Sequence, residues 1–262
     1  MIIETHSHLN VGLECVAAES SSYGKPVEGI RLYLENYRVC GIDACWTFGT
    51  WAWRCSELTM QENEQLAEIE RRYPDKIYPW GSVNPFWLEK QARRAIQQIA
   101  ALGLKGIKLV PVMHGCSLFS KNMDIVADEA EKNGLPIFFH DGSAEYCSAI
   151  QVAYFARAHP GLVVVSGHSG LRDFWRDYAE TAGDIPNLWF CLSGPTQWGI
   201  QKLYEHLGPE HLMFGSDGGL GAPAGIKAYL LRIARLEAPA AHKQMILGEN
   251  ALRFLREHCP QK

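Results

Sequence analysis

The chain has 262 residues, of which 47 % are hydrophobic and 21 % charged, and its 25 basic and 29 acidic residues give a formal net charge of −4. This length suits one large domain, and the composition excludes disordered and collagen-like proteins. Because neither sign of charge forms long runs, nucleic-acid binding is not expected, and the expected partner is a small-molecule substrate.

The cysteines and the apolar stretches indicate the expected cellular location and whether the protein associates with a membrane. None of the eight cysteines forms a CxxC pair, and the N-terminus shows no basic-then-apolar leader. The longest apolar stretches, such as residues 162–165, are far too short to span a bilayer. We therefore expect a cytoplasmic protein with no membrane association.

Eight short apolar runs, each bounded by glycine, proline or polar residues, are predicted as β-strands. They begin at Met1, Ile42, Ile77, Gly106, Pro136, Leu162, Leu188 and Leu212. Segments with helical spacing lie between them. One is expected to begin at Thr59 with a capping box to Glu62, and two others to end at Gly103 and Gly134.

The alternation of strands and helices predicts a parallel sheet, and eight repeats in about 250 residues predict a single (β/α)8 TIM barrel over residues 1–262. The alternative is an open doubly wound sheet. That fold is expected to carry a glycine-rich phosphate turn after its first strand, where this chain has HSHLNVGLE.

The first run, MIIETHSH, carries two histidines. Because strand side chains alternate between faces, Ile2, Glu4, His6 and His8 are expected to share one face. Such an HxH pair is typical of a metal site, but it is also found on solvated surface strands. The other strand ends must decide between these interpretations.

Four further predicted strands end in polar side chains: Lys108, His140, His168 and Asp217. Each alone has an ordinary structural role, as a core histidine, a helix cap or a paired lysine. In a barrel, however, the C-terminal ends of the strands meet on one face. Three histidine nitrogens and one carboxylate oxygen suit zinc or another divalent ion, with one position left for water and one histidine left for proton transfer.

These residues resemble the amidohydrolase superfamily, in particular the branch that includes aminocarboxymuconate-semialdehyde decarboxylase and several lactone and amide hydrolases. The matching segments are HSH at 6–8, GIKLVP at 106–111, FFHDG at 138–142, SGHSG at 166–170, LMFGSDGG at 212–219 and ILGENALRFL at 246–255.

The resemblance implies one divalent ion, zinc or else manganese, held by His6, His8, His140 and Asp217. It implies that His168 is the acid/base or carbonyl-polarising residue beside the metal and that Asp217 also takes the proton from bound water. Where relatives have an aspartate two residues before the first histidine, this chain has Glu4, which is expected to orient a ligand histidine without touching the ion.

Lys108 separates two kinds of site. In binuclear members of the superfamily the strand-four lysine is carboxylated and bridges two ions, whereas in the branch that this chain resembles it is unmodified. We expect one ion, with Lys108 as a cation near the substrate. Trp51 and Arg54 after the second strand and Trp198 after the seventh are further expected substrate contacts, although the tryptophans are almost as well explained by packing over the barrel mouth.

The primary functional prediction is a metal-dependent hydrolase of a small ester, lactone or amide, with metal-activated water as the nucleophile. The alternatives are a metal-dependent decarboxylase or hydratase that acts on an unsaturated carboxylic acid, and a metal-free lactonase in which Asp217 alone activates water. A catalytically silent binding protein is disfavoured, since competent side chains fill the expected ligand positions. A homodimer is the default assembly.

Overall fold

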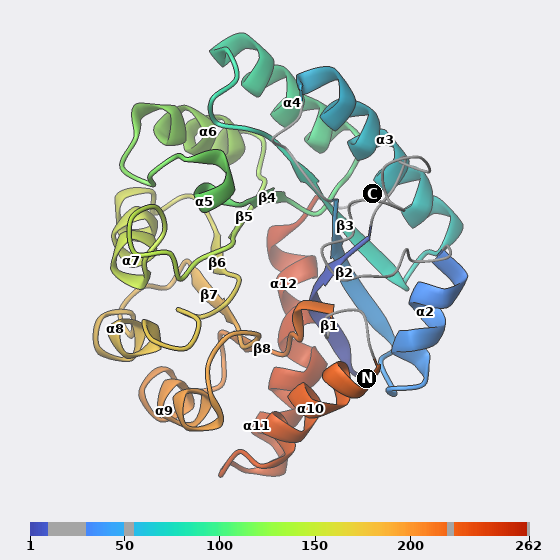
Figure 1. Cartoon of the computed structure of the whole chain (residues 1–262), viewed down its shortest axis with the longest axis vertical. Coiled ribbons are helices and arrows are strands. Elements are labelled where there is room, and N and C mark those ends of the chain that lie inside the picture. Colours follow the sequence, from blue (N-terminus) through green and yellow to red (C-terminus); the bar gives the residue numbers. More distant parts are fainter. Residues whose placement is uncertain (10–29, 50–54, 219–222, 261–262) are drawn as a thin grey trace.

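The computed structural model describes residues 1–9, 30–49, 55–218 and 223–260. Eight parallel strands form one sheet in sequence order (Figure 1). They are β1 (Ile3–His8), β2 (Ala44–Phe48), β3 (Ile77–Ser82), β4 (Ile107–Leu109), β5 (Ile137–Phe139), β6 (Val164–Ser166), β7 (Leu188–Cys191) and β8 (Leu212–Met213). The N–H of Thr5 donates to the carbonyl of Phe214 at 3.1 Å and joins the first strand to the residue after the last. The predicted (β/α)8 barrel is confirmed.

Helices alternate with the strands, and Figure 1 shows most of them around the outside of the ring. They are α2 (Ile30–Arg38), α3 (Ser56–Arg72), α4 (Glu89–Ala101), α5 (Pro111–His114), α6 (Lys121–Lys132), α7 (Ala149–Ala158), α8 (Trp175–Thr181), α9 (Gln197–Leu207), α10 (Pro223–Ala234), α11 (Ala240–Gln244), the π-helix η2 (Met245–Glu249) and α12 (Asn250–His258). Among the described residues, none of the helices combines the length and the apolar character needed to cross a membrane.

The structure agrees with the two predicted helix ends but not with the predicted helix start. α4 and α6 stop just before Gly103 and Gly134, whose φ angles of 72° and 62° are the left-handed values that favour glycine after a helix. The predicted capping box at Thr59 is wrong, because α3 begins at Ser56 and the N–H of Thr59 already donates to the carbonyl of Cys55. Residues 56–58 are compatible with helix, so the helix extends one turn further than the capping motif predicts.

The barrel interior is filled by aromatic rings, and α12 supplies one of them. Phe254 is fully buried, with its ring centroid 5.1 Å from those of both Trp46 and Trp189. Phe48 and Phe138 continue this packing, and the ring of His6 meets both of them edge-on. The polar strand-end residues therefore rest against an apolar layer.

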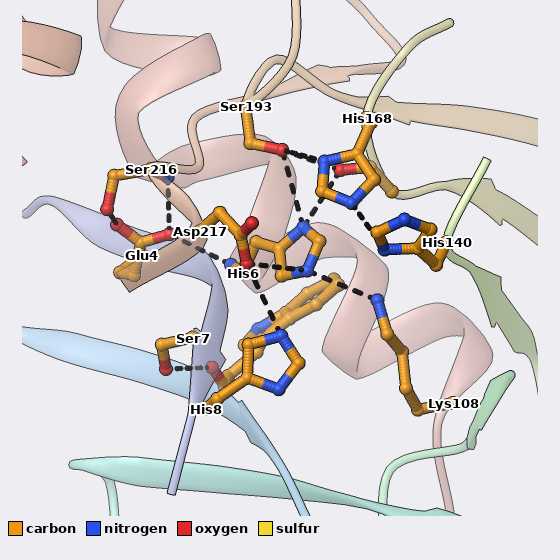
Figure 2. Close-up of polar contacts among 12 residues, drawn as sticks. Glu4, His6, Ser7, His8, Lys108, His140, His168, Ser193, Ser216 and Asp217 are labelled. Atoms are coloured by element: carbon orange, nitrogen blue, oxygen red, sulfur yellow. Dashed lines mark hydrogen bonds and ion pairs between the residues drawn. The ribbon is translucent and has the colours of Figure 1, made fainter. Parts of the chain in front are cut away.

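Strand β1 departs from strict alternation. Its pairing register with β2 shifts between Glu4 and Ser7. As a result Ile3 packs inside the barrel, while Ile2 packs in the outer core against the helices. The predicted shared face is therefore wrong for Ile2, because the irregularity changes which residues point inward. The side chains of His6 and His8 nevertheless both point toward Asp217 (Figure 2).

Candidate active site

Asp217 lies at the meeting point of the two histidines of β1. Its Oδ1 atom is 3.3 Å from Nε2 of His6 and 3.3 Å from Nε2 of His8 (Figure 2). Asp217 follows β8 by four residues and has a φ of 55°, so a left-handed backbone turns it toward β1. The Nζ atom of Lys108 is 3.1 Å from Nε2 of His6, and this lysine lies in the middle of β4 rather than at its end.

His140 and His168 complete the arrangement. Nε2 of His168 is 2.8 Å from Nδ1 of His140, and the rings of His6 and His168 lie 4.6 Å apart. The structure therefore brings together all six polar residues predicted at strand ends. We call this set the central cluster: His6, His8, Lys108, His140, His168 and Asp217.

A chain of hydrogen bonds assigns the imidazole tautomers. The carbonyl of Gly167 can only accept, and it lies 2.9 Å from Nδ1 of His6 and 2.8 Å from the hydroxyl of Ser193. Since Ser193 donates there, it accepts from Nδ1 of His168 at 2.9 Å. Nε2 of His168 then accepts from Nδ1 of His140. The unprotonated Nε2 atoms of His6 and His140 are consequently able to bind a metal.

Burial sets the charges in the cluster. It lowers the pKa of His6 and of His168 well below the usual range and the pKa of His140 to about 4, so these rings are neutral at pH 7. Burial also lowers the pKa of Lys108 to about 8. Burial alone would raise the pKa of Asp217, but the hydrogen bond from His8 holds it well below the usual range, so the carboxylate is ionised.

Glu4 acts on the backbone beside the cluster. Its carboxyl group accepts from the N–H of His6 at 2.9 Å, and from the N–H and hydroxyl of Ser216 at 2.8 and 2.6 Å. Burial raises the pKa of Glu4 to about 8. It therefore ties β1 to the loop that carries Asp217, and it touches the main chain of His6 rather than an imidazole nitrogen.

Two residues that hold the cluster were missed from the sequence. Ser193 follows β7 by two residues and contacts His168, so the rule that selected polar strand-end residues would also have found it. Asp141 is fully buried and accepts from the N–H of His168 at 2.7 Å. Nothing in the FFHDG segment separates this aspartate from a solvated loop residue.

The donor spacing fits a divalent metal ion. Tetrahedral zinc with bonds of about 2.0–2.1 Å separates its ligand atoms by about 3.3–3.4 Å. The two histidine nitrogens that flank Asp217 both match this spacing, at 3.3 Å from Oδ1. Ligand atoms of His6, His168 and Asp217 also lie within 4.8 Å of one another, but Ser193 and His140 already engage both ring nitrogens of His168. Neutral imidazoles and an ionised carboxylate are the donor types that such an ion needs.

The predicted substrate contacts are only partly described. Trp51 and Arg54 lie outside the described residues. Trp198 is 53 % exposed on α9, where it packs edge-on against Trp175 and near the guanidinium of Arg176. Among the described residues, no ring contact or hydrogen bond joins Trp198 to the central cluster.

A family model described as Amidohydrolase matches residues 47–256.

Three similar solved structures are decarboxylases. The 5-carboxyvanillate decarboxylase of Sphingomonas paucimobilis is 18 % identical, with a TM-score of 0.71 and coverage of 97 % of this chain and 98 % of that one. The 2,6-dihydroxybenzoate decarboxylase of Rhizobium is 15 % identical, with a TM-score of 0.72 and coverage of 97 % and 98 %. The 5-carboxyvanillate decarboxylase of Novosphingobium aromaticivorans, complexed with manganese, is 14 % identical, with a TM-score of 0.73 and coverage of 98 % and 96 %. No curated protein matches the chain in sequence.

Proposed function

The chain belongs to the amidohydrolase family and is an enzyme of that family, and from this premise we propose that it is a metal-dependent decarboxylase of an aromatic or otherwise unsaturated carboxylic acid. This puts the alternative prediction ahead of ester, lactone or amide hydrolysis. The support from relatives is that the three similar folds reported above belong to enzymes that remove carboxyl groups from aromatic acids.

The observation that carries the proposal is the setting of Lys108. Its side chain is buried, and its Nζ atom lies 4.5 Å from the ring centre of Phe48 and 4.3 Å from that of Phe138. With a pKa of about 8 it is largely charged at pH 7. Asp217 supplies part of the negative charge that such a buried cation needs, and a planar unsaturated carboxylate adds both further charge and a flat surface.

We propose that His6, His8, His140 and Asp217 hold one divalent ion, with manganese and zinc both compatible with these donors. Such an ion, when bound, supplies Lewis acidity that withdraws charge from a substrate oxygen. Lys108 binds the substrate carboxylate through a charge-assisted hydrogen bond and remains unmodified. When the carbon–carbon bond breaks, its electron pair stays on the substrate carbon, CO2 departs, and that carbon takes a proton. The proton comes from water, and we assign its delivery to His168, which is neutral at rest and takes up a proton from solvent before it passes one to the substrate carbon. Ser193 and His140 orient the ring.

Hydrolysis is the second candidate function, and the ionised Asp217 favours it. A carboxylate beside the metal donors can accept a proton from water, and His168 can then stabilise or protonate the developing oxyanion. A metal-free lactonase would use the same carboxylate without an ion. These candidates differ in their products and in their response to chelation.

The test is a substrate screen with protein of measured metal content. Hydroxylated aromatic acids and unsaturated dicarboxylic acids form one set, and lactones, esters and amides form the other. We expect release of CO2 from the first set without net consumption of water, and about one metal ion per chain. Asp217→Asn and His6→Ala should lose both metal and activity. Lys108→Met should lower kcat/KM by roughly 10- to 150-fold, the effect of losing one charge-assisted hydrogen bond.

Lys202→Met is the matched control, because it removes an ammonium from the outer helix α9 and should leave kcat/KM unchanged. Turnover of the second set alone would replace decarboxylation with hydrolysis. Full hydrolytic activity after exhaustive chelation would favour the metal-free lactonase.

A further inference from the structure

One cavity of the described structure is lined by residues outside the central cluster. Its volume is about 500 Å³, and its lining residues are Arg172, Thr196, Gln197, Ala228, Leu231, Arg232 and Arg235. They come from the loop after β6, the start of α9, and α10 with the residue that follows it. Figure 1 shows α9 and α10 outside the ring of strands. No member of the central cluster lines this cavity.

The charged residues that line the cavity are all positive. Three of the lining side chains are guanidinium groups, and none is a carboxylate. Within the described part of the chain, these three arginines form no ion pair. Arg232 in the last turn of α10 and Arg235 just after the helix both line the cavity, so their like charges repel one another there. An anion bound in the cavity would remove this repulsion.

The guanidinium of Arg232 is held in place. Its Nη1 atom donates to the carbonyl of Pro195 at 2.9 Å, and its central carbon lies 4.2 Å above the ring of Tyr229. The planar group carries five N–H donors, so this contact leaves others available to a ligand. A fixed guanidinium loses little side-chain entropy when it binds an anion.

The other polar residues that line the cavity come from the start of α9 and from the loop after β6. The hydroxyl of Thr196 caps α9 by accepting from the N–H of Gly199 at 3.2 Å, and its own O–H can donate to a ligand. Gln197 donates to the carbonyl of Arg232 at 3.1 Å and so links α9 to α10. Arg172 is anchored through its own carbonyl, which accepts from the indole of Trp175 at 3.1 Å. The Arg232 guanidinium and the Thr196 hydroxyl are thus held in place, and the exposed Arg172 and Arg235 side chains add two further guanidinium groups at the rim.

We propose that this cavity binds a small anion with two or more negative charges, either a phosphate compound or an oligocarboxylate. Both present several oxygens to which guanidinium groups donate in bidentate fashion, and three cations match their charge. None of its lining residues belongs to the central cluster, so the inference does not depend on which reaction that cluster performs.

The test is calorimetric titration of the full chain at pH 8 and fixed low ionic strength. The probes are inorganic phosphate and propane-1,2,3-tricarboxylate. We expect saturable binding of at least one of them at a single site, with a Kd below about 1 mM. Binding of phosphate alone or of the tricarboxylate alone identifies the source of the anionic groups.

Variants test whether the anion binds in this cavity. The double variant Arg172→Gln/Arg235→Gln should bind at least about tenfold more weakly, because both side chains are exposed and their loss removes two cations without disturbing the core. Arg94→Gln, an exposed arginine on α4, is the matched charge control and should bind normally. Lys108→Met should also bind normally.

The proposal is overturned if neither probe saturates by about 10 mM, or if Arg94→Gln weakens binding as much as the double variant does. It is also overturned if Lys108→Met abolishes binding while the double variant retains it, because the anion would then lie at the central cluster. None of these results bears on whether the enzyme decarboxylates or hydrolyses its substrate.

Discussion

The carboxylate of Asp141 holds the loop that carries His168. It accepts hydrogen bonds from the N–H groups of His168 and Gly170, each at 2.7 Å, and from the hydroxyls of Ser166 and Tyr178 at 2.8 and 3.2 Å. Two non-glycine residues of this loop, Ser169 and Leu171, have left-handed φ angles of 47° and 53°. Such conformations are unfavourable and persist where surrounding contacts enforce them. Asp141 is therefore a positioning residue for His168.

Replacement of Asp141 by Asn tests this role at the residue scale. An amide presents only one acceptor oxygen, so its NH2 group would face a backbone N–H. We expect the free energy of unfolding to fall by about 2–3 kcal/mol, and kcat to fall more than KM changes because His168 loses its orientation. Urea unfolding and steady-state kinetics measure the two effects. Tyr178→Phe is the control, since it removes only the longest of the four bonds and should cost about 1 kcal/mol. Equal values of kcat in Asp141→Asn and wild type would contradict the assignment.

At the scale of elements, α12 matters more to the barrel than its position near the end of the chain suggests. Most described helices pack outside the ring of strands, but α12 sends Phe254 into the interior cluster. There it meets Trp46, Trp80 and Trp189. The helix thus completes the apolar layer against which the polar cluster rests.

Truncation of Phe254 tests this contribution. Phe254→Ala should lower the free energy of unfolding by about 3–5 kcal/mol, through lost burial and the cavity left among the indole rings. Leu252→Ala on the same helix is the matched control. Its side chain is 37 % exposed, so we expect a change below about 1 kcal/mol. Chemical denaturation at a single pH measures both. A loss in Phe254→Ala no larger than in the control would mean that α12 does not complete the core.

At the scale of the whole molecule, the central cluster gathers side chains from five separate strands or the loops after them. A metal ion that binds these residues in the folded state and not in the unfolded chain stabilises the fold by mass action. Removal of the metal should therefore lower Tm by several degrees, and addition of manganese or zinc should restore it in a concentration-dependent way. Differential scanning calorimetry measures the shift. In Asp217→Asn the same treatments should leave Tm nearly unchanged, and an equal shift there would place the metal elsewhere.

Much of the barrel could be predicted from the sequence, because buried parallel strands are short apolar runs and the alternation with helices is regular. The central cluster could be predicted from one rule, which is that the polar side chains at the ends of these runs lie together on the C-terminal face of the barrel. The irregular register of β1 was not predictable, since it depends on pairing with β2 rather than on local pattern. Nor was the arginine-lined cavity, whose residues lie in three separate segments of the sequence. The homodimer and the cytoplasmic location remain predictions.

The bond between Glu4 and Ser216 spans 212 positions of the sequence, from the first strand to the loop after the last. During synthesis on the ribosome, His6 and His8 emerge early, but the carboxylate that they face emerges only when most of the chain is already outside. The two parts of the proposed metal site are therefore both available only after most of the chain has been synthesised. At the proposed metal site, binding is therefore expected only after the barrel has closed.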